Sequence, residues 1–148
     1  MEPYRHTVQY YETDKMGITH HSNYIRWMEE ARTDFLRQIG WPYEKLEEAG
    51  IFSPVTALSC KYRASTTFAE NIDIRVSVAE FRGAVLKIRY KMTNAAGRTV
   101  FEGQSEHCFL NAGGSILRLK RDCPALHETL TALAADGAGA ETDQTDGR

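Results

Sequence analysis

The sequence predicts an α+β domain in which one long helix packs against an antiparallel sheet. The 148 residues favour a single domain with one core. One helical apolar stripe occurs early in the chain, and four later segments have strand character, with turn signals between them. A helix and a sheet that each have one apolar face are stable when those faces pack together.

The N-terminal third predicts a strand, a loop and the long helix. Residues 4–11 are β-prone and rich in tyrosine, and a loop is expected over residues 12–20. Ser22 or Asn23 is the expected N-cap, because either side-chain oxygen accepts from an unpaired helix amide. Gly40 and Pro42 are expected to end the helix. Its apolar stripe recurs at steps of three and four, at Tyr24, Met28, Ala31, Phe35 and Ile39.

The rest of the chain is predicted to be mainly strand. A short helix is expected over residues 42–50 and a closing helix over residues 123–135. Four strands are expected between them, at residues 54–65, 71–81, 84–94 and 99–111. The sequence therefore predicts one domain over residues 1–135. Residues 136–148 are small, polar and acidic, and are predicted to be a disordered tail.

Composition and charge exclude several classes of protein. The net charge is −2, and residues 136–148 carry −3, so residues 1–135 carry +1, which gives no case for nucleic-acid binding. The three cysteines form no CxxC motif, which favours a reducing compartment over a disulfide framework or a zinc site. The N-terminus lacks the apolar segment of a signal peptide, and no apolar run reaches the roughly 20 residues of a membrane span. A cytoplasmic protein is expected.

Asp14 lies in the predicted loop, and two interpretations of it are open. It is either a turn acid that satisfies local backbone amides, or a catalytic carboxylate close to the start of a helix. In the second case it acts as a general base on water, or as a nucleophile towards an acyl carbon. Gly17, three residues later, is either a turn residue or a point where a substrate approaches the backbone closely.

His20 and His21 lie where the long helix is expected to begin. A metal site is not expected, because no third ligand lies at a suitable spacing. The first amides of a helix have no intrahelical partner and carry a partial positive charge. Such amides polarise a carbonyl whose oxygen becomes negative in the transition state. A carboxylate upstream of them supplies the other half of an acyl-transfer site.

Other polar residues have a structural interpretation that competes with a functional one. Ser105 and His107 share a strand with apolar residues, and a hydrogen-bonded core histidine is expected there. No GxSxG, Gly-rich phosphate loop or GxGxxG motif is present. Basic residues on strand faces are expected either to be solvated or to bind phosphates, at Lys61, Arg63, Lys87, Arg89 and Lys91.

The loop and helix together carry a pattern that resembles a known family. The matching residues are Tyr11, Asp14, Gly17, His21, Tyr24, Glu29, Ala31 and Arg32. They resemble the hot-dog thioesterases of the 4-hydroxybenzoyl-CoA thioesterase type, in particular the YbgC-like acyl-CoA thioesterase branch. The resemblance covers roughly residues 4–127, and a pattern of many positions is a more specific signal than a lone glycine motif.

The resemblance implies a hot-dog fold, with a long helix wrapped by a curved antiparallel sheet. It implies a homodimer, often assembled further into a homotetramer, with active sites at the subunit interface. Asp14 then corresponds to the catalytic carboxylate, and the His21 backbone amide to the group that polarises the thioester carbonyl. Gly17 belongs to the loop that admits the thioester. The resemblance implies no metal and no bound cofactor, since CoA is part of the substrate.

Three positions depart from the pattern of related sequences. Ser65 and Glu70 stand where relatives often have a proline and an aspartate. That loop lies near the expected entry of the pantetheine and nucleotide, so substrate preference there is open. His20 replaces a common aromatic or apolar residue, and is expected to make the acyl pocket more polar.

The predicted function is hydrolysis of acyl-CoA thioesters. The CoA phosphates are expected to lie on basic residues, with Lys61, Arg63, Arg82 and Arg89 as candidates. One alternative is a hot-dog hydratase acting on enoyl- or hydroxyacyl-CoA, in which Asp14 and His20 imitate the required acid and histidine. The other is a non-catalytic acyl-CoA-binding protein, although the sequence shows no helix-turn-helix and no basic arm.

Overall fold

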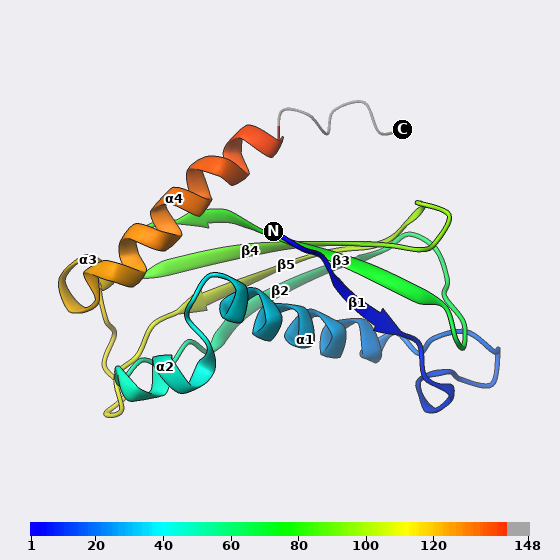
Figure 1. Ribbon diagram of the computed structural model, residues 1–148. Coiled ribbons are helices and arrows are strands. Elements are labelled where there is room, and N and C mark those ends of the chain that lie inside the picture. Colours follow the sequence, from blue (N-terminus) through cyan, green and yellow to red (C-terminus); the bar gives the residue numbers. More distant parts are fainter. Residues whose placement is uncertain (142–148) are drawn as a thin grey trace. The chain divides into compact units, whose positions relative to one another are not determined.

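The computed structural model of the chain describes residues 1–141 and confirms the predicted α+β class (Figure 1). Within that range, five strands form one sheet in the order β1-β3-β4-β5-β2. The strands are β1 (Tyr4–Thr7), β2 (Val55–Tyr62), β3 (Asn71–Phe81), β4 (Val85–Thr93) and β5 (Thr99–Cys108). The helices are the 3₁₀ turn η1 (Tyr10–Glu12), α1 (Ser22–Gln38), α2 (Tyr43–Glu48), α3 (Leu119–Asp122) and α4 (Pro124–Glu141).

The described chain forms two compact units, to which strands β2 to β5 each contribute residues. The first unit comprises Met1–Pro42, Ser59–Val76 and Tyr90–Gln104. The second comprises Tyr43–Leu58, Ser77–Arg89 and the residues from Ser105 onward. The loop with Asp14, all of α1 and the end of β2 belong to the first unit, which therefore holds the predicted catalytic residues.

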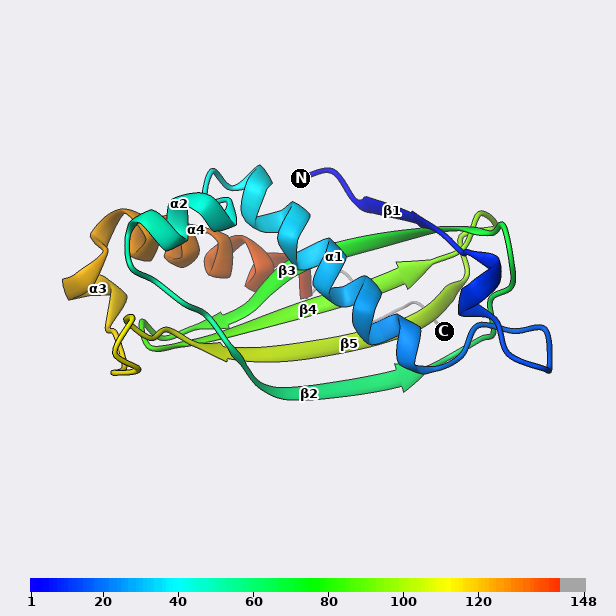
Figure 2. The ribbon, with the colours of Figure 1, turned by 90° about the horizontal axis from the view of Figure 1, so that it is seen from below.

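Helix α1 supplies the apolar centre of the first unit. Four residues of its predicted stripe are buried, Tyr24, Met28, Ala31 and Phe35, whereas Ile39 lies just past the helix end and is half-buried. Gly103 on β5 allows the helix to approach, because a Cβ there would lie 2.8 Å from the Phe101 ring and 3.0 Å from the Met28 methyl carbon. Strand β1 runs beside α1 in both ribbon views (Figures 1 and 2). The helix is thus held by its apolar face, as its periodicity predicted.

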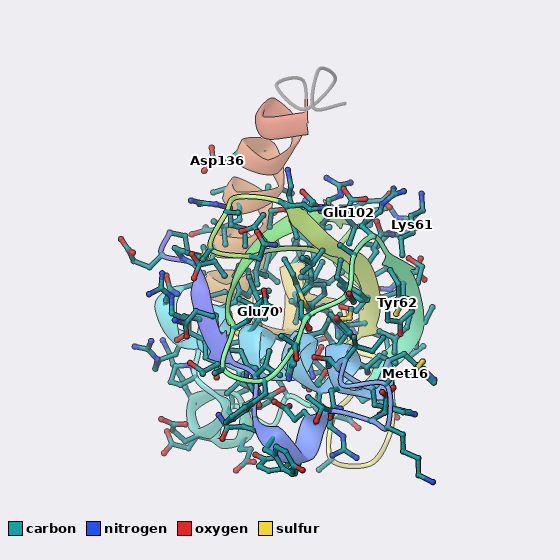
Figure 3. All side chains as sticks on the ribbon, turned by 90° about the vertical axis from the view of Figure 1, so that its right-hand side faces the viewer. Met16, Lys61, Tyr62, Glu70, Glu102 and Asp136 are labelled. Carbon is teal, nitrogen blue, oxygen red and sulfur yellow. The ribbon has the colours of Figure 1, made fainter. Side chains whose placement is uncertain are left out.

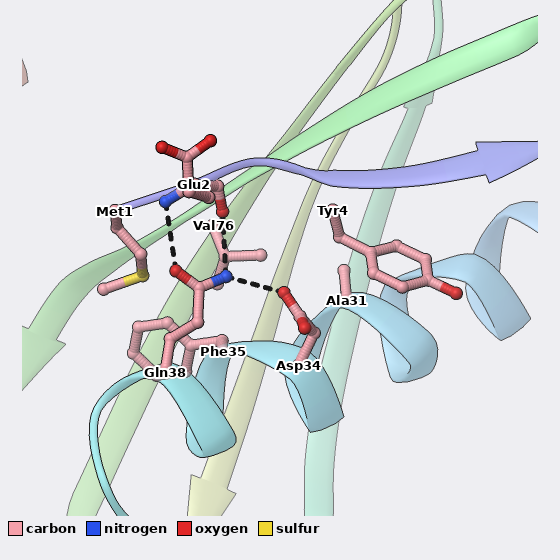
Figure 4. A pocket seen from close by; sticks show the side chains of 8 residues that line it. All are labelled: Met1, Glu2, Tyr4, Ala31, Asp34, Phe35, Gln38 and Val76. Carbon is pink, nitrogen blue, oxygen red and sulfur yellow. Dashed lines mark hydrogen bonds between the residues drawn. The ribbon is translucent and has the colours of Figure 1, made fainter.

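A shallow hollow lies between the N-terminal residues and the end of α1 (Figure 4). The Gln38 side chain closes it, because its amide donates to the Glu2 carbonyl at 2.9 Å and its oxygen accepts from the Glu2 N–H at 3.0 Å. The hollow contains none of the predicted catalytic residues. The hydrogen bonds between Gln38 and Glu2 hold the residues ahead of β1 in place. The hollow is therefore a structural feature rather than a substrate site.

The first strand is shorter than predicted and ends at Thr7. Residues Tyr10–Glu12 form the turn η1, because the Glu12 carboxylate accepts from the Gln9 N–H at 2.8 Å and closes a capping box. Strand propensity in this tyrosine-rich segment is therefore overridden by a side-chain contact. The predicted N-cap is also wrong, since the N-cap of α1 is His21 rather than Ser22 or Asn23.

In the second unit, α4 packs against β3. The His127 ring lies 5.2 Å from the Phe81 ring, and Leu126 and Leu130 are buried. A Cβ at Gly137 would clash with the Val78 carbonyl oxygen, so only glycine permits this approach.

Both outer edges of the sheet can thus be compared. At one edge, strand β1 pairs with Asn71–Ile74 of β3. Strand β2 forms the other edge, and its residues are exposed along nearly the whole strand. Val55, Leu58 and Tyr62 are 40%, 44% and 48% exposed there, an unusual amount of apolar surface for a strand.

The C-terminal helix extends beyond the expected boundary at residue 135. Helix α4 continues to Glu141, so residues 136–141 of the predicted tail are helical. Residues 142–148 lie outside the described residues, and the single domain and disordered tail stay predictions. Helix α3 was not predicted; the Asp122 carboxylate accepts from the Arg118 N–H at 2.8 Å and stabilises this single turn. None of the helices described is long and apolar enough to cross a membrane.

Candidate active site

Asp14 lies in a tight loop whose two ends are bridged. Thr13 and Thr19 form an antiparallel bridge, and the Asp14 N–H donates to the Ile18 carbonyl at 2.9 Å. The Asp14 side chain is half-buried, and its Oδ1 accepts from the Met16 N–H at 2.8 Å. This is the local turn contact that the structural interpretation required. It uses one carboxylate oxygen and leaves Oδ2 available.

Gly17 completes the loop. Its φ of +80° lies in the left-handed region that favours glycine, and no atom lies within 4 Å of where a Cβ would be. The Gly17 carbonyl accepts from the Thr67 hydroxyl at 2.7 Å, which ties this loop to the segment after β2. Both interpretations of Gly17 agree with the structure, since it is a turn residue next to open space.

His20 organises the start of α1. Its backbone carbonyl accepts from the Asn23 N–H at 3.0 Å, and its Nδ1 lies 3.2 Å from the Ser22 N and 2.8 Å from the Ser22 hydroxyl. The Ser22 hydroxyl is therefore turned to His20 rather than to the helix. The Asn23 side-chain amide donates to the Glu12 carbonyl at 2.9 Å. These contacts explain why neither residue serves as the N-cap.

The His21 backbone N–H differs from the two amides that follow it. Those of Ser22 and Asn23 are both taken by His20. Within residues 1–141 no hydrogen bond occupies the His21 N–H, and the residue is exposed. It thus presents an unpaired donor at the positive end of a helix of 17 residues.

Aromatic rings line the strand side of the helix start. The Tyr62 hydroxyl donates to the His21 carbonyl at 3.1 Å, and the two rings meet edge to face at 6.3 Å. The Tyr62 ring also packs against Tyr24 and Phe101 at 5.4 and 5.3 Å. Burial raises the pKa of Tyr62, and so does the neighbouring Cys60. Tyr62 was not predicted as a site residue, and its only sequence signal was its position beside Lys61.

A buried hydroxyl chain supports the other side of the loop. Thr19 and Thr66 are buried, with their hydroxyl oxygens 2.6 Å apart, and the Tyr24 hydroxyl lies 2.9 Å from Thr66. Burial raises the pKa of Tyr24, against the lowering effect of the Thr66 hydrogen bond. The phenol therefore stays neutral and structural. This row of hydroxyls holds Thr19 in place, and Thr19 closes the base of the Asp14 loop.

The first two predicted phosphate ligands lie in the first unit. Lys61 is exposed on β2, whereas the Arg63 guanidinium is paired with Glu102, 2.9 and 3.0 Å from its Oε2. Figure 3 shows Tyr62 between Lys61 and Met16 of the Asp14 loop in that view. Strand neighbours face opposite sides of a sheet, so Lys61 and the site-facing Tyr62 point different ways.

The other two predicted ligands, Arg82 and Arg89, belong to the second unit. Arg82 is paired with Glu80 at 3.2 Å. Lys87 is held between Glu80 and Glu106 at 3.1 and 3.3 Å, and both carboxylates raise its pKa. These basic side chains are therefore held in ion pairs on a partly exposed strand face.

The segment after β2 departs from the family pattern and also carries backbone strain. The Glu70 carboxylate accepts from the Thr67 N–H at 2.6 Å, so Glu70 is a local turn acid. Ala69 has a φ of +72°, and it is the non-glycine residue with a positive φ among those described. Ser65 is exposed. This segment meets the Asp14 loop through the hydrogen bonds that Thr66 and Thr67 make to it.

Two further expectations concern residues outside the loop. Ser105 and His107 are 2% and 0% exposed, and Ser105 Oγ lies 2.7 Å from His107 Nε2, which confirms the predicted core histidine. Over the described part of the chain, no group of three histidine, cysteine or acidic side chains is placed to hold a metal ion.

Comparisons with known proteins show the family of the chain. A sequence model of the thioesterase-like superfamily matches residues 8–133. YneP of Bacillus subtilis, a candidate acyl-CoA thioesterase, is 32% identical over 100 residues, which cover 68% of this chain and 72% of YneP. The acyl-CoA thioester hydrolase YbgC of Escherichia coli is 25% identical over 97 residues, covering 66% and 72%.

Among solved structures, the DHNA-CoA thioesterase of Staphylococcus aureus superposes with a TM-score of 0.87. The two proteins are 29% identical, and the match covers 94% of each chain. The resemblance to hot-dog, YbgC-like thioesterases and the predicted hot-dog fold are therefore confirmed. Because the family model spans most of its length, this chain belongs to the thioesterase-like superfamily.

Proposed function

We propose that this protein hydrolyses acyl-CoA thioesters to a free acid and CoA. One observation carries the proposal: an unpaired amide at the start of α1 follows directly on a bridged loop that holds a half-buried carboxylate. Acyl transfer requires such a pair, a base or nucleophile and a donor for the developing oxyanion. The relatives that carry thioesterase names support the same activity.

The reaction follows from these two groups. In one route Asp14 takes a proton from water, and the hydroxide attacks the thioester carbon. In the other, Asp14 itself attacks and forms an anhydride, which water then opens. In both routes the carbonyl oxygen becomes negative beside the His21 N–H and the positive end of the helix. The C–S bond then breaks, and CoA leaves as a thiolate, a leaving group that needs little acid assistance. No metal or bound cofactor enters either route.

The CoA phosphates are proposed to bind at basic residues. Of the four candidates, Lys61 is exposed on the strand face opposite Tyr62, whereas Arg63 and Arg82 are each paired with a glutamate. A homodimer, or a tetramer made from two dimers, is proposed as the active form in the cytoplasm. The exposed apolar edge of β2 supports this assembly, because such edges are normally paired or covered.

Thiol release from a panel of acyl-CoAs, aliphatic and aromatic, tests the activity. We expect turnover of at least one member. Crotonyl-CoA separates thioesterase from hydratase, because free thiol appears only when the thioester is cleaved. Hydration of crotonyl-CoA without thiol release, or tight acyl-CoA binding without any turnover, would overturn the proposal.

A single turnover in ¹⁸O-labelled water distinguishes the two routes. If Asp14 is a general base, the first molecule of product acid already carries ¹⁸O. If Asp14 is the nucleophile and water opens the anhydride at the aspartyl carbon, the label enters Asp14 first and the product only in later turnovers. Mass spectrometry of the product and of the peptide with Asp14 reads out both.

A further inference from the structure

A second carboxylate, Glu12, lies two residues before Asp14 and is used by neither route above. It is only 5% exposed, and it is among the most buried acidic residues described. Its Oε1 accepts from the Gln9 N–H at 2.8 Å and lies 2.7 Å from His6 Nε2. Its Oε2 accepts from the indole N–H of Trp27 at 2.7 Å. A buried charge this well satisfied is held in one position.

The backbone of Glu12 connects this anchored side chain to both halves of the candidate site. Its carbonyl accepts from the His20 N–H at 2.8 Å and from the Asn23 side-chain amide at 2.9 Å. The His20 N–H directly precedes the unpaired His21 N–H in the chain. Asp14 lies two residues after Glu12 on the other side of the loop. Glu12 therefore fixes the position of the Asp14 carboxylate and that of the His21 N–H, the oxyanion donor.

The anchor reaches α1 and β1 as well. Trp27 lies on the second turn of α1, and its ring stacks on His6 of β1 at 4.5 Å between centroids. The other nitrogen of His6, Nδ1, lies 2.9 Å from the Glu30 carboxylate, which also accepts from the Tyr4 hydroxyl at 3.1 Å. Both ring nitrogens of His6 thus lie within hydrogen-bond distance of a carboxylate, Nε2 of Glu12 and Nδ1 of Glu30.

We propose that Glu12 is a positioning residue for thioester hydrolysis, which sets the placement of Asp14 relative to the His21 N–H. This inference rests on the proposed function. Glu12 touches neither the substrate nor the reacting atoms, and it acts through the backbone on each side of the loop. Misplacement of a catalytic group by about 1 Å costs as much as 10²-fold in rate, so loss of this anchor acts on turnover rather than on binding.

Glu12→Gln is the principal test. The glutamine side chain has the same shape, but one of its two oxygens is replaced by an NH₂ group, a donor that then faces the donors that now bind Glu12. We expect kcat to fall about 10-fold to 100-fold, while KM changes less than about 2-fold. Ile74→Val, a buried change on β3, controls for lost stability and should keep kcat. Assays are run where circular dichroism shows every variant folded. An unchanged kcat in Glu12→Gln, or an equal fall in Ile74→Val, would overturn the proposal.

A double-mutant cycle shows through which group Glu12 acts. In an Asp14→Asn background, Glu12→Gln should lower the residual rate by a smaller factor than in wild type, since one of the two groups that it positions is already absent. Fully additive losses would contradict positioning. Trp27→Phe removes only one donor to Glu12 and provides a milder variant if Glu12→Gln does not fold. It should lower kcat in the same direction, and Glu12→Asp, which restores the charge, should recover part of the loss.

Hydrogen exchange separates this inference from the proposed function. Glu12→Gln should speed exchange of the His20 and Asp14 amides while leaving the amides of β4 unchanged. This readout does not depend on catalysis. If wild-type protein cleaves no thioester, the proposed function fails, but the exchange result still decides whether Glu12 positions the loop. Unchanged exchange at His20 and Asp14 would overturn the positioning role.

Discussion

Glu12 and Asp14 are carboxylates two residues apart with opposite surroundings. Glu12 is buried and has three hydrogen-bond partners, the Gln9 N–H ahead of η1, His6 on β1 and Trp27 on α1. Asp14 is half-buried and takes one, from its own loop. Burial raises the pKa of Glu12, but hydrogen bonds from the Gln9 N–H, His6 and Trp27 outweigh it and lower the pKa overall. Full hydrogen bonding makes a carboxylate structural, whereas a free oxygen beside open space leaves it available for chemistry.

The largest expected effect comes from Asp14→Asn. The amide keeps the turn contact to Met16 but removes the base or nucleophile, so turnover should fall by about 10² to 10⁴. The melting temperature should stay close to that of wild type, because the side chain has one local contact. Thiol release and thermal denaturation measure the two quantities. Near-normal turnover would show that Asp14 has no catalytic role.

Glu12→Leu, in contrast to Asp14→Asn, should lower the stability of the protein. It leaves the indole N–H of Trp27 and the His6 ring without their buried partner, so the free energy of unfolding should fall by about 3 kcal/mol. Urea denaturation measures it, with Asp73→Asn as a control that removes a more exposed carboxylate paired with Arg5. That control should cost less than about 1 kcal/mol. Equal losses in both variants would mean that the burial of Glu12 has no energetic consequence.

The pH dependence of the melting temperature should reveal the surroundings of Glu12 without a large mutation. A lowered pKa in the folded state means that Glu12 stabilises the protein above its ordinary value of 4.5. That stabilisation is lost as the pH falls below 4.5 and through the folded pKa. The melting temperature of wild type should therefore fall more steeply below pH 4.5 than that of Glu12→Gln, which cannot titrate there. Parallel curves would contradict the lowered pKa.

The smallest expected effect is that of Tyr62→Phe. The ring keeps its contacts with Tyr24 and Phe101 and loses only the hydroxyl that donates to the His21 carbonyl. Such a bond to a partly exposed residue is worth about 1 kcal/mol, so turnover should fall a few-fold at most. Steady-state kinetics test this. A loss as large as that of Asp14→Asn would place Tyr62 in the reaction itself.

Periodicity explains what the sequence predicted well. The stripe of α1 and the alternation in β3 and β4 are local patterns, and the structure buries the faces they indicate. Asp14 and Gly17 were recognised because their spacing to the helix is fixed along the chain. The bond from Asp14 to Met16 likewise spans two residues.

Long-range contacts explain what the sequence did not predict. The N-cap was misplaced because Asn23 is drawn to a carbonyl 11 residues earlier. The role of Glu12 was invisible because its partner Trp27 lies 15 residues away, on another element. Sequence alone also could not show that Arg63 is already paired with Glu102, 39 residues further on. In each case a tertiary partner, rather than the residue type, decides the outcome.

The unequal edges of the sheet have a consequence for how large an assembly can grow. A sheet open at both edges adds copies indefinitely and forms fibres. Here β1 is the outer strand at one edge and β2 at the other, and within the described residues β2 is the longer and more exposed of the two. Pairing of two copies through β2, the assembly proposed above, would use both β2 edges and so be complete with two chains.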